Sequence, residues 1–216
     1  MVSHQGISGK GKHFIEKIKL IIGDSNKFYD KVSGEDLGEP IKYLLLVLII
    51  PTVLIILLSG LFMTFVLGII QAMPGGADIP AFVLTLGPLI GVLFGVFYYI
   101  STFVGSFIHG AILHVIVYLM GAKKGFQNTY KAVAYGQTPN IIFGWIPLLN
   151  IVFGIWSWYL VIKGLSKLQD MTMGRAFLAT IIPIIVLIAL AVLGAMMFAI
   201  ASSVGSAFDP SMFPVN

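Results

Sequence analysis

The chain has 216 residues, of which 58% are hydrophobic and only 10% are charged. Because an ordinary soluble domain is about a quarter charged, this composition excludes a soluble enzyme and a disordered chain and indicates a polytopic membrane protein. The net charge of +4 suits either nucleic acid or an anionic membrane surface, and the positions of the charges decide between them.

Residues 1–40 are predicted to form a cytoplasmic segment with an amphipathic helix. Apolar side chains recur at helical spacing from Phe14 to Ile22, and lysines flank them. This pattern is typical of a helix that lies on the cytoplasmic leaflet, with Lys17 and Lys19 as contacts to lipid or to a partner. A flexible, solvated segment is the alternative. Asp24 is expected to interrupt the helix and cap a second one.

Residues 41–204 are predicted to form the membrane domain, and residues 205–216 a short outer tail. A bilayer core of about 30 Å needs about 20 apolar residues in a helix. One long uncharged run is divided at Gly144 and Pro147, because glycine and proline interrupt helices. The expected fold is an all-α integral membrane protein, a bundle of five transmembrane helices at residues 41–70, 87–120, 126–143, 147–165 and 176–204.

The basic residues support this count. With five spans, all 13 lysines and arginines lie at or beyond the span ends on one side of the membrane. Positive charge favours the cytoplasmic side, which predicts a multi-pass protein of the cell membrane with a cytoplasmic N-terminus and an outside C-terminus. Lys123 and Lys124, between the second and third spans, are further candidate contacts for lipid or a partner. Membrane lipids explain the positive charge, and no nucleic acid is expected.

Several polar side chains fall within the predicted second and third spans. Such groups are expensive among lipid tails and usually face a bundle interior or a cavity. Histidines that bond to a neighbouring span, a proton- or ligand-sensing role and a metal site are the three interpretations. Two histidines five residues apart are poorly spaced for one metal ion, so no metal site is predicted. The candidate polar cluster comprises His109, His114, Tyr118, Tyr135, Gln137, Pro139 and Asn140.

Pro139 is expected to perturb the third span. It has no backbone N–H to donate to the carbonyl of Tyr135, and that carbonyl needs another donor in lipid. Gln137, Thr138 or a histidine of the second span could supply it. The site would then be either a cavity or hinge near the membrane midplane, or a satisfied kink that only packs.

Three glycines open the second span at intervals of four residues. Gly87, Gly91 and Gly95 form a pattern of small residues that lets two helices approach closely. The partner helix is either another span of the same chain or, in a homo-oligomer, a span of a second copy.

Groups that could perform catalysis are not apparent. No acidic residue lies within a predicted span, and the chain has no cysteine. A pairing of Ser106 with His109 would lack an acidic residue to orient the histidine. We therefore expect no enzyme, no catalytic residue and no cofactor.

Three stretches of the sequence carry a resemblance to a known family. They are residues 24–29 before the first span, residues 125–139 in the third span, and residues 159–168 followed by 173–176 across the end of the fourth span and the start of the fifth. In this order they resemble the Yip domain family of Ypt/Rab GTPase-interacting membrane proteins, over residues from 24 to the end of the fifth span. Two eukaryotic motifs are kept in part: Asp36, Leu37 and Pro40 of one, and Tyr135 and Pro139 of the other.

The resemblance implies five spans, a cytoplasmic N-terminus and an outside or lumenal C-terminus. Its eukaryotic members bind prenylated small GTPases and act in vesicle budding and Golgi organisation, whereas the 40-residue lead suggests a prokaryotic-type member. The leading hypothesis is a non-enzymatic scaffold or adaptor in membrane organisation or trafficking-like recruitment, with a protein partner at the cytoplasmic face. The alternatives are a small transporter or channel that uses a polar cavity between spans two and three, and a lipid- or isoprenoid-binding protein.

Overall fold

The computed structural model describes residues 5–75, 80–84 and 86–207. The described residues form an all-α fold without strands. Asp78, Asp209 and most of the predicted outer tail lie outside them. The last helix continues to residue 207, so the beginning of that tail is helical.

Four helices are long and apolar enough to cross a membrane, which makes the chain a multi-pass membrane protein. Each of them overlaps one predicted span. Three contain 34 or 35 residues, a length of roughly 50 Å, which exceeds the thickness of the hydrocarbon core. These four helices are α3 (Gly38–Ala72), α5 (Leu86–Leu119), α8 (Leu149–Leu168) and α9 (Met173–Ala207).

The region expected to form the third span differs from the prediction. Instead of one continuous helix over residues 126–143, it consists of α6 (Gly125–Gly136) and α7 (Thr138–Phe143), which are separated at Gln137. The break occurs here because Pro139 cannot continue the hydrogen-bond ladder of α6. Every residue from 129 to 136 is buried, so α6 lies at the centre of the bundle, in contact with α3, α5 and α8.

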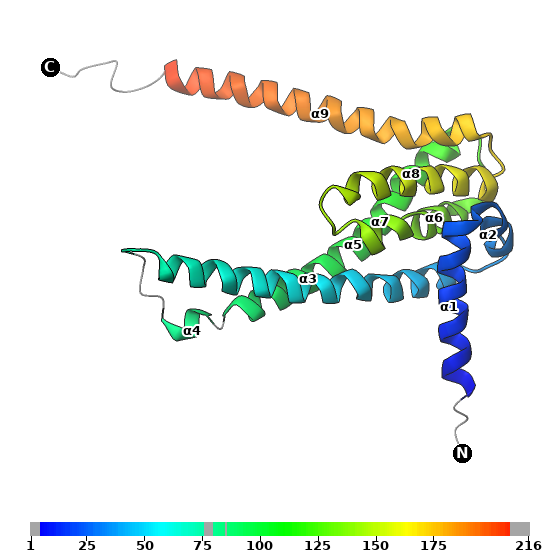
Figure 1. The fold of residues 1–216 in the computed structure, drawn as a ribbon. Helices are drawn as coiled ribbons and strands as arrows, with labels where there is room; N and C mark the ends of the chain where they lie inside the picture. The colour runs from blue at the N-terminus through cyan, green and yellow to red at the C-terminus, as the bar shows by residue number, and fades with distance from the viewer. Residues whose placement is uncertain (1–4, 76–79, 85, 208–216) are drawn as a thin grey trace.

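The N-terminal residues form two helices, α1 (Gln5–Gly23) and α2 (Ser25–Val32). Asp24 separates them as expected, and its carboxylate accepts a hydrogen bond of 3.1 Å from the backbone N–H of Lys27. Figure 1 shows α1 crossing the direction of α3 near the beginning of that helix.

The three glycines of the second predicted span pack against α3 of the same chain. A Cβ at Gly91 would lie 2.5 Å from the carbonyl oxygen of Ile56 and 2.9 Å from the backbone nitrogen of Gly60. Gly87 and Gly95 are equally close to α3. The glycines therefore allow the backbones of α3 and α5 to approach, and their face is not free for a second copy. The short helix α4 (Ala81–Leu84) precedes α5.

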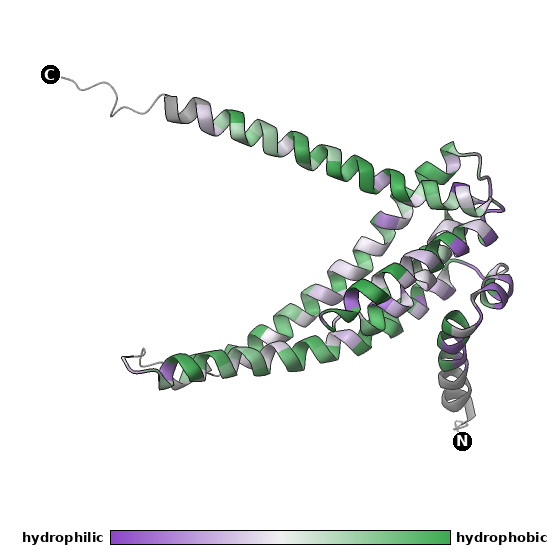
Figure 2. Cartoon of the chain, turned by 45° about the horizontal axis from the view of Figure 1, so that its top comes forward, coloured by the Kyte–Doolittle hydropathy of each residue, from purple (hydrophilic) through white to green (hydrophobic). Residues whose placement is uncertain are grey.

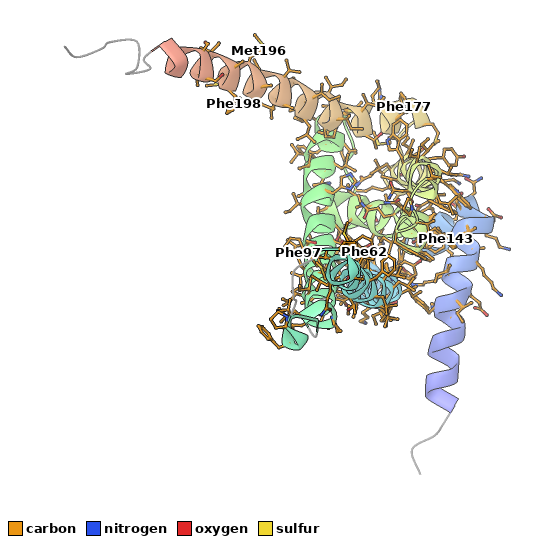
Figure 3. The ribbon with its side chains drawn as sticks, turned by 60° about the vertical axis from the view of Figure 1, so that its left-hand side comes forward. Phe62, Phe97, Phe143, Phe177, Met196 and Phe198 are labelled. Atoms are coloured by element: carbon orange, nitrogen blue, oxygen red, sulfur yellow. The ribbon has the colours of Figure 1, made fainter. Side chains whose placement is uncertain are left out.

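The outer part of α9 exposes apolar side chains all round the helix, and the outer parts of α3 and α5 expose them on the faces that do not pack against each other. Phe62 is 68% exposed and Phe198 is 77% exposed, and Figure 3 shows side chains projecting from both edges of the outer part of α9 in that view. Figure 2 shows hydrophobic residues along these outer parts and hydrophilic residues gathered at the end where α2 lies. An exposed apolar surface of this extent suits lipid rather than water.

Candidate functional site

A first group of polar side chains joins the N-terminal helices to the centre of the bundle. The ammonium of Lys17 lies 2.7 Å from Glu35 and 3.6 Å from Glu39. The hydroxyl of Tyr135 donates a hydrogen bond of 2.5 Å to the other carboxylate oxygen of Glu35. Because Tyr135 is completely buried and Glu35 precedes α3, these contacts anchor α1 and the α2–α3 segment on α6.

Lys131 strengthens the same junction. Its side chain is completely buried, and its ammonium donates a hydrogen bond of 2.9 Å to the carbonyl of Ser33. Gln127, one turn earlier on α6, donates to the backbone carbonyl of Glu35. The segment between α2 and α3 is therefore held by three side chains of α6, those of Gln127, Lys131 and Tyr135.

The carbonyl that Pro139 leaves without its helical partner is satisfied locally. The hydroxyl of Thr138 donates a hydrogen bond of 2.6 Å to the carbonyl of Tyr135, and it lies 2.9 Å from the hydroxyl of Tyr43 on α3. Thr138 was one of the three donors suggested by the sequence. The kink is thus both satisfied and tied to α3.

His114 and Tyr118 lie away from the other residues of the predicted cluster. The Nδ1 atom of His114 is 3.0 Å from the hydroxyl of Thr129, which also accepts a hydrogen bond from the amide of Gln169. Gln169 in turn donates to the carbonyl of Gly125 and accepts from the backbone of Lys124. Tyr118 is 65% exposed. This part of the cluster joins the ends of α5, α6 and α8.

His109, Gln137 and Asn140 lie together on the wall of a cavity of about 580 Å³ between α5, α7, α8 and α9. The amide nitrogen of Gln137 is 2.9 Å from Nδ1 of His109. The backbone N–H of Asn140 donates a hydrogen bond of 2.9 Å to the hydroxyl of Ser157. The Oδ1 atom of Asn140 is buried without a hydrogen-bond partner.

Two further cavity residues connect α8 with α9. The indole N–H of Trp158 donates a hydrogen bond of 2.9 Å to the hydroxyl of Thr180, which donates to the carbonyl of Phe177. The cavity is therefore lined by residues of the predicted second, third, fourth and fifth spans. Among the described residues, no group of three or more histidine, aspartate or glutamate side chains could hold a metal ion.

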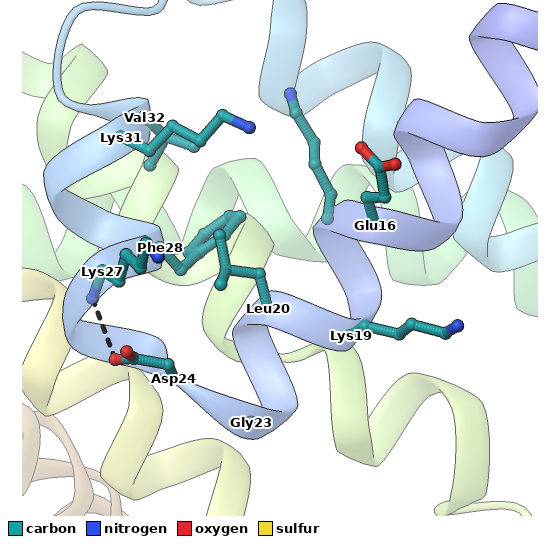
Figure 4. A pocket seen from close by; sticks show the side chains of 10 residues that line it. Glu16, Lys19, Leu20, Gly23, Asp24, Lys27, Phe28, Lys31 and Val32 are labelled. Atoms are coloured by element: carbon teal, nitrogen blue, oxygen red, sulfur yellow. Dashed lines mark hydrogen bonds between the residues drawn. The ribbon is translucent and has the colours of Figure 1, made fainter.

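The four candidate lysines have three different environments. Lys17 is buried in its ion pair, which removes it from the surface that a lipid or a partner could contact. Lys124 forms an ion pair with Asp170 and is partly exposed. Lys123 is exposed. Lys19 is exposed beside a groove of about 490 Å³ between α1 and α2 (Figure 4).

Glu35, Ser157 and Thr180 were not identified from the sequence. Glu35 lies 100 residues from its partner Tyr135, and its position next to the Asp36–Pro40 motif was the signal available. Ser157 and Thr180 are polar residues in predicted spans, so the rule that selected His109 could have selected them as well. Both are hydroxyl residues, which helices in lipid also tolerate through bonds to their own backbone.

A family model described as Yip1 domain matches residues 21–207 of the chain. No curated protein and no solved structure matches it. The match begins in α1 and ends at the last residue of α9. It therefore includes Glu35, which pairs with Lys17, and all the residues that line the cavity.

Proposed function

The chain belongs to the Yip1 domain family, and from this premise we propose that it is a non-enzymatic membrane scaffold or adaptor that binds a protein partner at its cytoplasmic face. The observation that carries the proposal is the firm attachment of α1 and α2 to one end of the bundle. A docking element that is already ordered loses less conformational freedom on binding than a mobile one.

The attachment of α2 is extensive. Phe28 and Tyr29 are completely buried, and the ring of Phe28 packs edge-on against Tyr135 with centroids 5.0 Å apart. The hydroxyl of Tyr29 donates a hydrogen bond of 2.9 Å to the carbonyl of Leu160 on α8. Burial raises the pKa of Tyr29, so this hydroxyl stays protonated and remains a donor.

The groove between α1 and α2 is the surface that this attachment presents. Leu20 provides a partly exposed apolar wall, whereas Phe28 and Val32 are buried beneath the groove. The rims carry three lysines and two acidic residues: Lys19, Lys27, Lys31, Glu16 and Asp24 (Figure 4). The three lysines are exposed, whereas the neighbouring Lys17 is neutralised by Glu35. The chemistry suits a partner segment with apolar side chains and acidic neighbours.

The orientation is part of the proposal. Lys124 pairs with Asp170, and Lys167 lies 3.1 Å from Asp30. These pairs bring the end of α2, the beginning of α6 and the end of α8 to one end of the bundle. We propose that this end faces the cytoplasm, that α6 and α7 together form a fifth crossing, that α1 lies along the leaflet, and that the C-terminus is outside the cell membrane.

The test is photo-crosslinking in native membranes from positions 19 and 27, with position 61 as a matched control. Lys19 and Lys27 flank the groove, whereas Leu61 is an exposed residue in the middle of α3. We expect a defined protein adduct from the two groove positions and none from position 61. The same adduct should weaken when Lys31→Glu reverses the charge of the rim. Capture of neither a partner nor a second copy would contradict the adaptor function.

A further inference from the structure

The cavity between α5, α7, α8 and α9 has the size of a ligand site. Its volume of about 580 Å³ falls within the range of roughly 300–1,000 Å³ that is typical of small-molecule pockets. His109 is ten residues from the end of α5, or roughly 15 Å along the helix. The cavity therefore lies within the apolar part of the bundle, where any occupant must be compatible with lipid.

The entrance of the cavity faces the lipid-exposed side of the bundle. Ile108 and Ile112 of α5 and Ile184 and Leu187 of α9 line the cavity, and all four side chains are exposed. Figure 1 shows α9 diverging from α5 beyond this point. An apolar chain from the bilayer can therefore enter between the two helices without crossing a polar surface.

Polar side chains of His109, Asn140 and Ser157 also line the cavity, and some of their hydrogen-bonding atoms have no partner. Because Nδ1 of His109 accepts from Gln137, the neutral imidazole carries its proton on Nε2. Within the described residues, neither this Nε2–H nor the Nδ2 group of Asn140 has a partner. Ser157 accepts from the backbone of Asn140, which leaves its own hydroxyl proton to donate. Unpaired polar groups are costly at membrane depth, and here they include the buried Oδ1 of Asn140 as well as these donors.

The lack of acidic residues in the surrounding sequence further limits which head group the occupant can carry. The sequence contains no aspartate or glutamate from residue 79 to residue 169 or from residue 171 to residue 208. A cationic head would find no opposite charge in the cavity. An oxygen acceptor would pair with the donors of His109 and Asn140 without bringing an unbalanced positive charge into the membrane.

We propose that the cavity binds one acyl chain whose carbonyl oxygen accepts hydrogen bonds from His109 and Asn140, as in a fatty acyl ester. The chain lies between α5 and α9, along Ile112 and Ile184. The cavity is separate from the groove between α1 and α2, so a test of lipid binding in the cavity does not depend on the proposed adaptor function.

The experiment compares two photoactivatable probes in full-length protein reconstituted into nanodiscs of a diether phosphatidylcholine, whose chains carry no ester carbonyl. One is methyl palmitate with a diazirine in the chain, and the other is the hexadecyl methyl ether with the same diazirine. The probes differ at the head by the carbonyl alone. We expect the ester to label the protein about fivefold more than the ether, the ratio that one net hydrogen bond provides. The labelled peptides should come from α5 and α9 around the cavity.

Two matched glycine variants locate the site. Gly105 lines the cavity, and a Cβ there meets nothing within 4 Å, so Gly105→Leu fills the cavity and should abolish labelling by both probes. Gly68 on α3 has the same open surroundings outside the cavity, so Gly68→Leu should leave labelling unchanged. Asn140→Leu should lower the ester-to-ether ratio towards one, and His109→Leu provides the same test if the first variant does not fold.

Three results would overturn the inference. Equal labelling of the unmodified protein by both probes would exclude recognition of the carbonyl. Labelling that survives Gly105→Leu, or that maps outside α5 and α9, would place the lipid elsewhere. Absence of labelling by either probe would exclude an acyl chain from the cavity.

Discussion

The ammonium of Lys17 lies 2.7 Å from a carboxylate oxygen of Glu35, and this contact fixes α1 to the segment that precedes α3. The side chain of Lys17 is 7% exposed and that of Glu35 is 19% exposed. Tyr135, which bonds to the same carboxylate, connects the pair to α6. Lys17, which the sequence suggests as a contact to lipid or to a partner, thus belongs to the internal structure of the protein.

Removing the cation from this pair should destabilise the cytoplasmic end. Lys17→Met leaves Glu35 half-buried without its counter-charge, and we expect a loss of about 3 kcal/mol. Thermal unfolding in detergent should show a lower midpoint, and limited proteolysis should cleave the α1–α2 region sooner. Lys19→Met, two residues away on an exposed position, is the control and should behave like the unmodified protein. Equal midpoints for both variants would show that the pair does not hold α1.

A side chain at Gly91 should separate α3 from α5. The Cβ of Gly91→Val would meet the backbone of Ile56 at 2.5 Å, and backbone atoms cannot move aside as flexible side chains do. We expect a loss of about 1–3 kcal/mol, measured by thermal unfolding in detergent. Gly68→Val, on a helix face with nothing within 4 Å, controls for the substitution itself. If the glycine row instead served a homodimer, Gly91→Val would change the oligomeric state rather than the unfolding midpoint.

The hydroxyl of Thr138 should contribute to the stability of the folded protein. Thr138→Val keeps the shape of the side chain but leaves the carbonyl of Tyr135 and the hydroxyl of Tyr43 without this partner in a buried site. The expected loss of stability is about 1–3 kcal/mol. Thr138→Ser retains the hydroxyl and should recover most of the loss in the same unfolding assay. A serine variant as unstable as the valine variant would assign the effect to packing.

The proposed crossing by α6 and α7 can be tested by labelling, because the chain has no cysteine of its own. Lys123 precedes α6, and Leu148, which is 84% exposed, follows α7. An impermeant thiol reagent on intact cells should label Leu148→Cys but not Lys123→Cys, which should react only after permeabilisation. Labelling of both positions, or of neither, from the outside would mean that α6 and α7 do not cross.

Local features of the sequence determined the positions of most helices. The apolar runs of α3, α5, α8 and α9 are long enough to be recognised without knowledge of their neighbours, because the bilayer sets the minimum length. Asp24 and Pro139 also act locally, one through a cap and the other through a missing N–H, so the separation of α1 from α2 and the donor role of Thr138 could be anticipated. The complete break at Gln137 was not anticipated, since proline kinks many helices without ending them.

The sequence selected polar residues within the membrane but could not group them. His109 and His114 lie on the same helix, and only the packing of α5 against α6 and α9 assigns one to the cavity and the other to Thr129. Lys17 and Lys19 are the same residue type in the same stretch of the sequence. In the folded protein, however, the side chain of Lys17 is buried in its ion pair with Glu35, whereas that of Lys19 is exposed. Lengths, caps and charge bias follow from neighbouring residues, whereas ion pairs and cavities depend on side chains far apart in the chain, and those meet only when the helices pack.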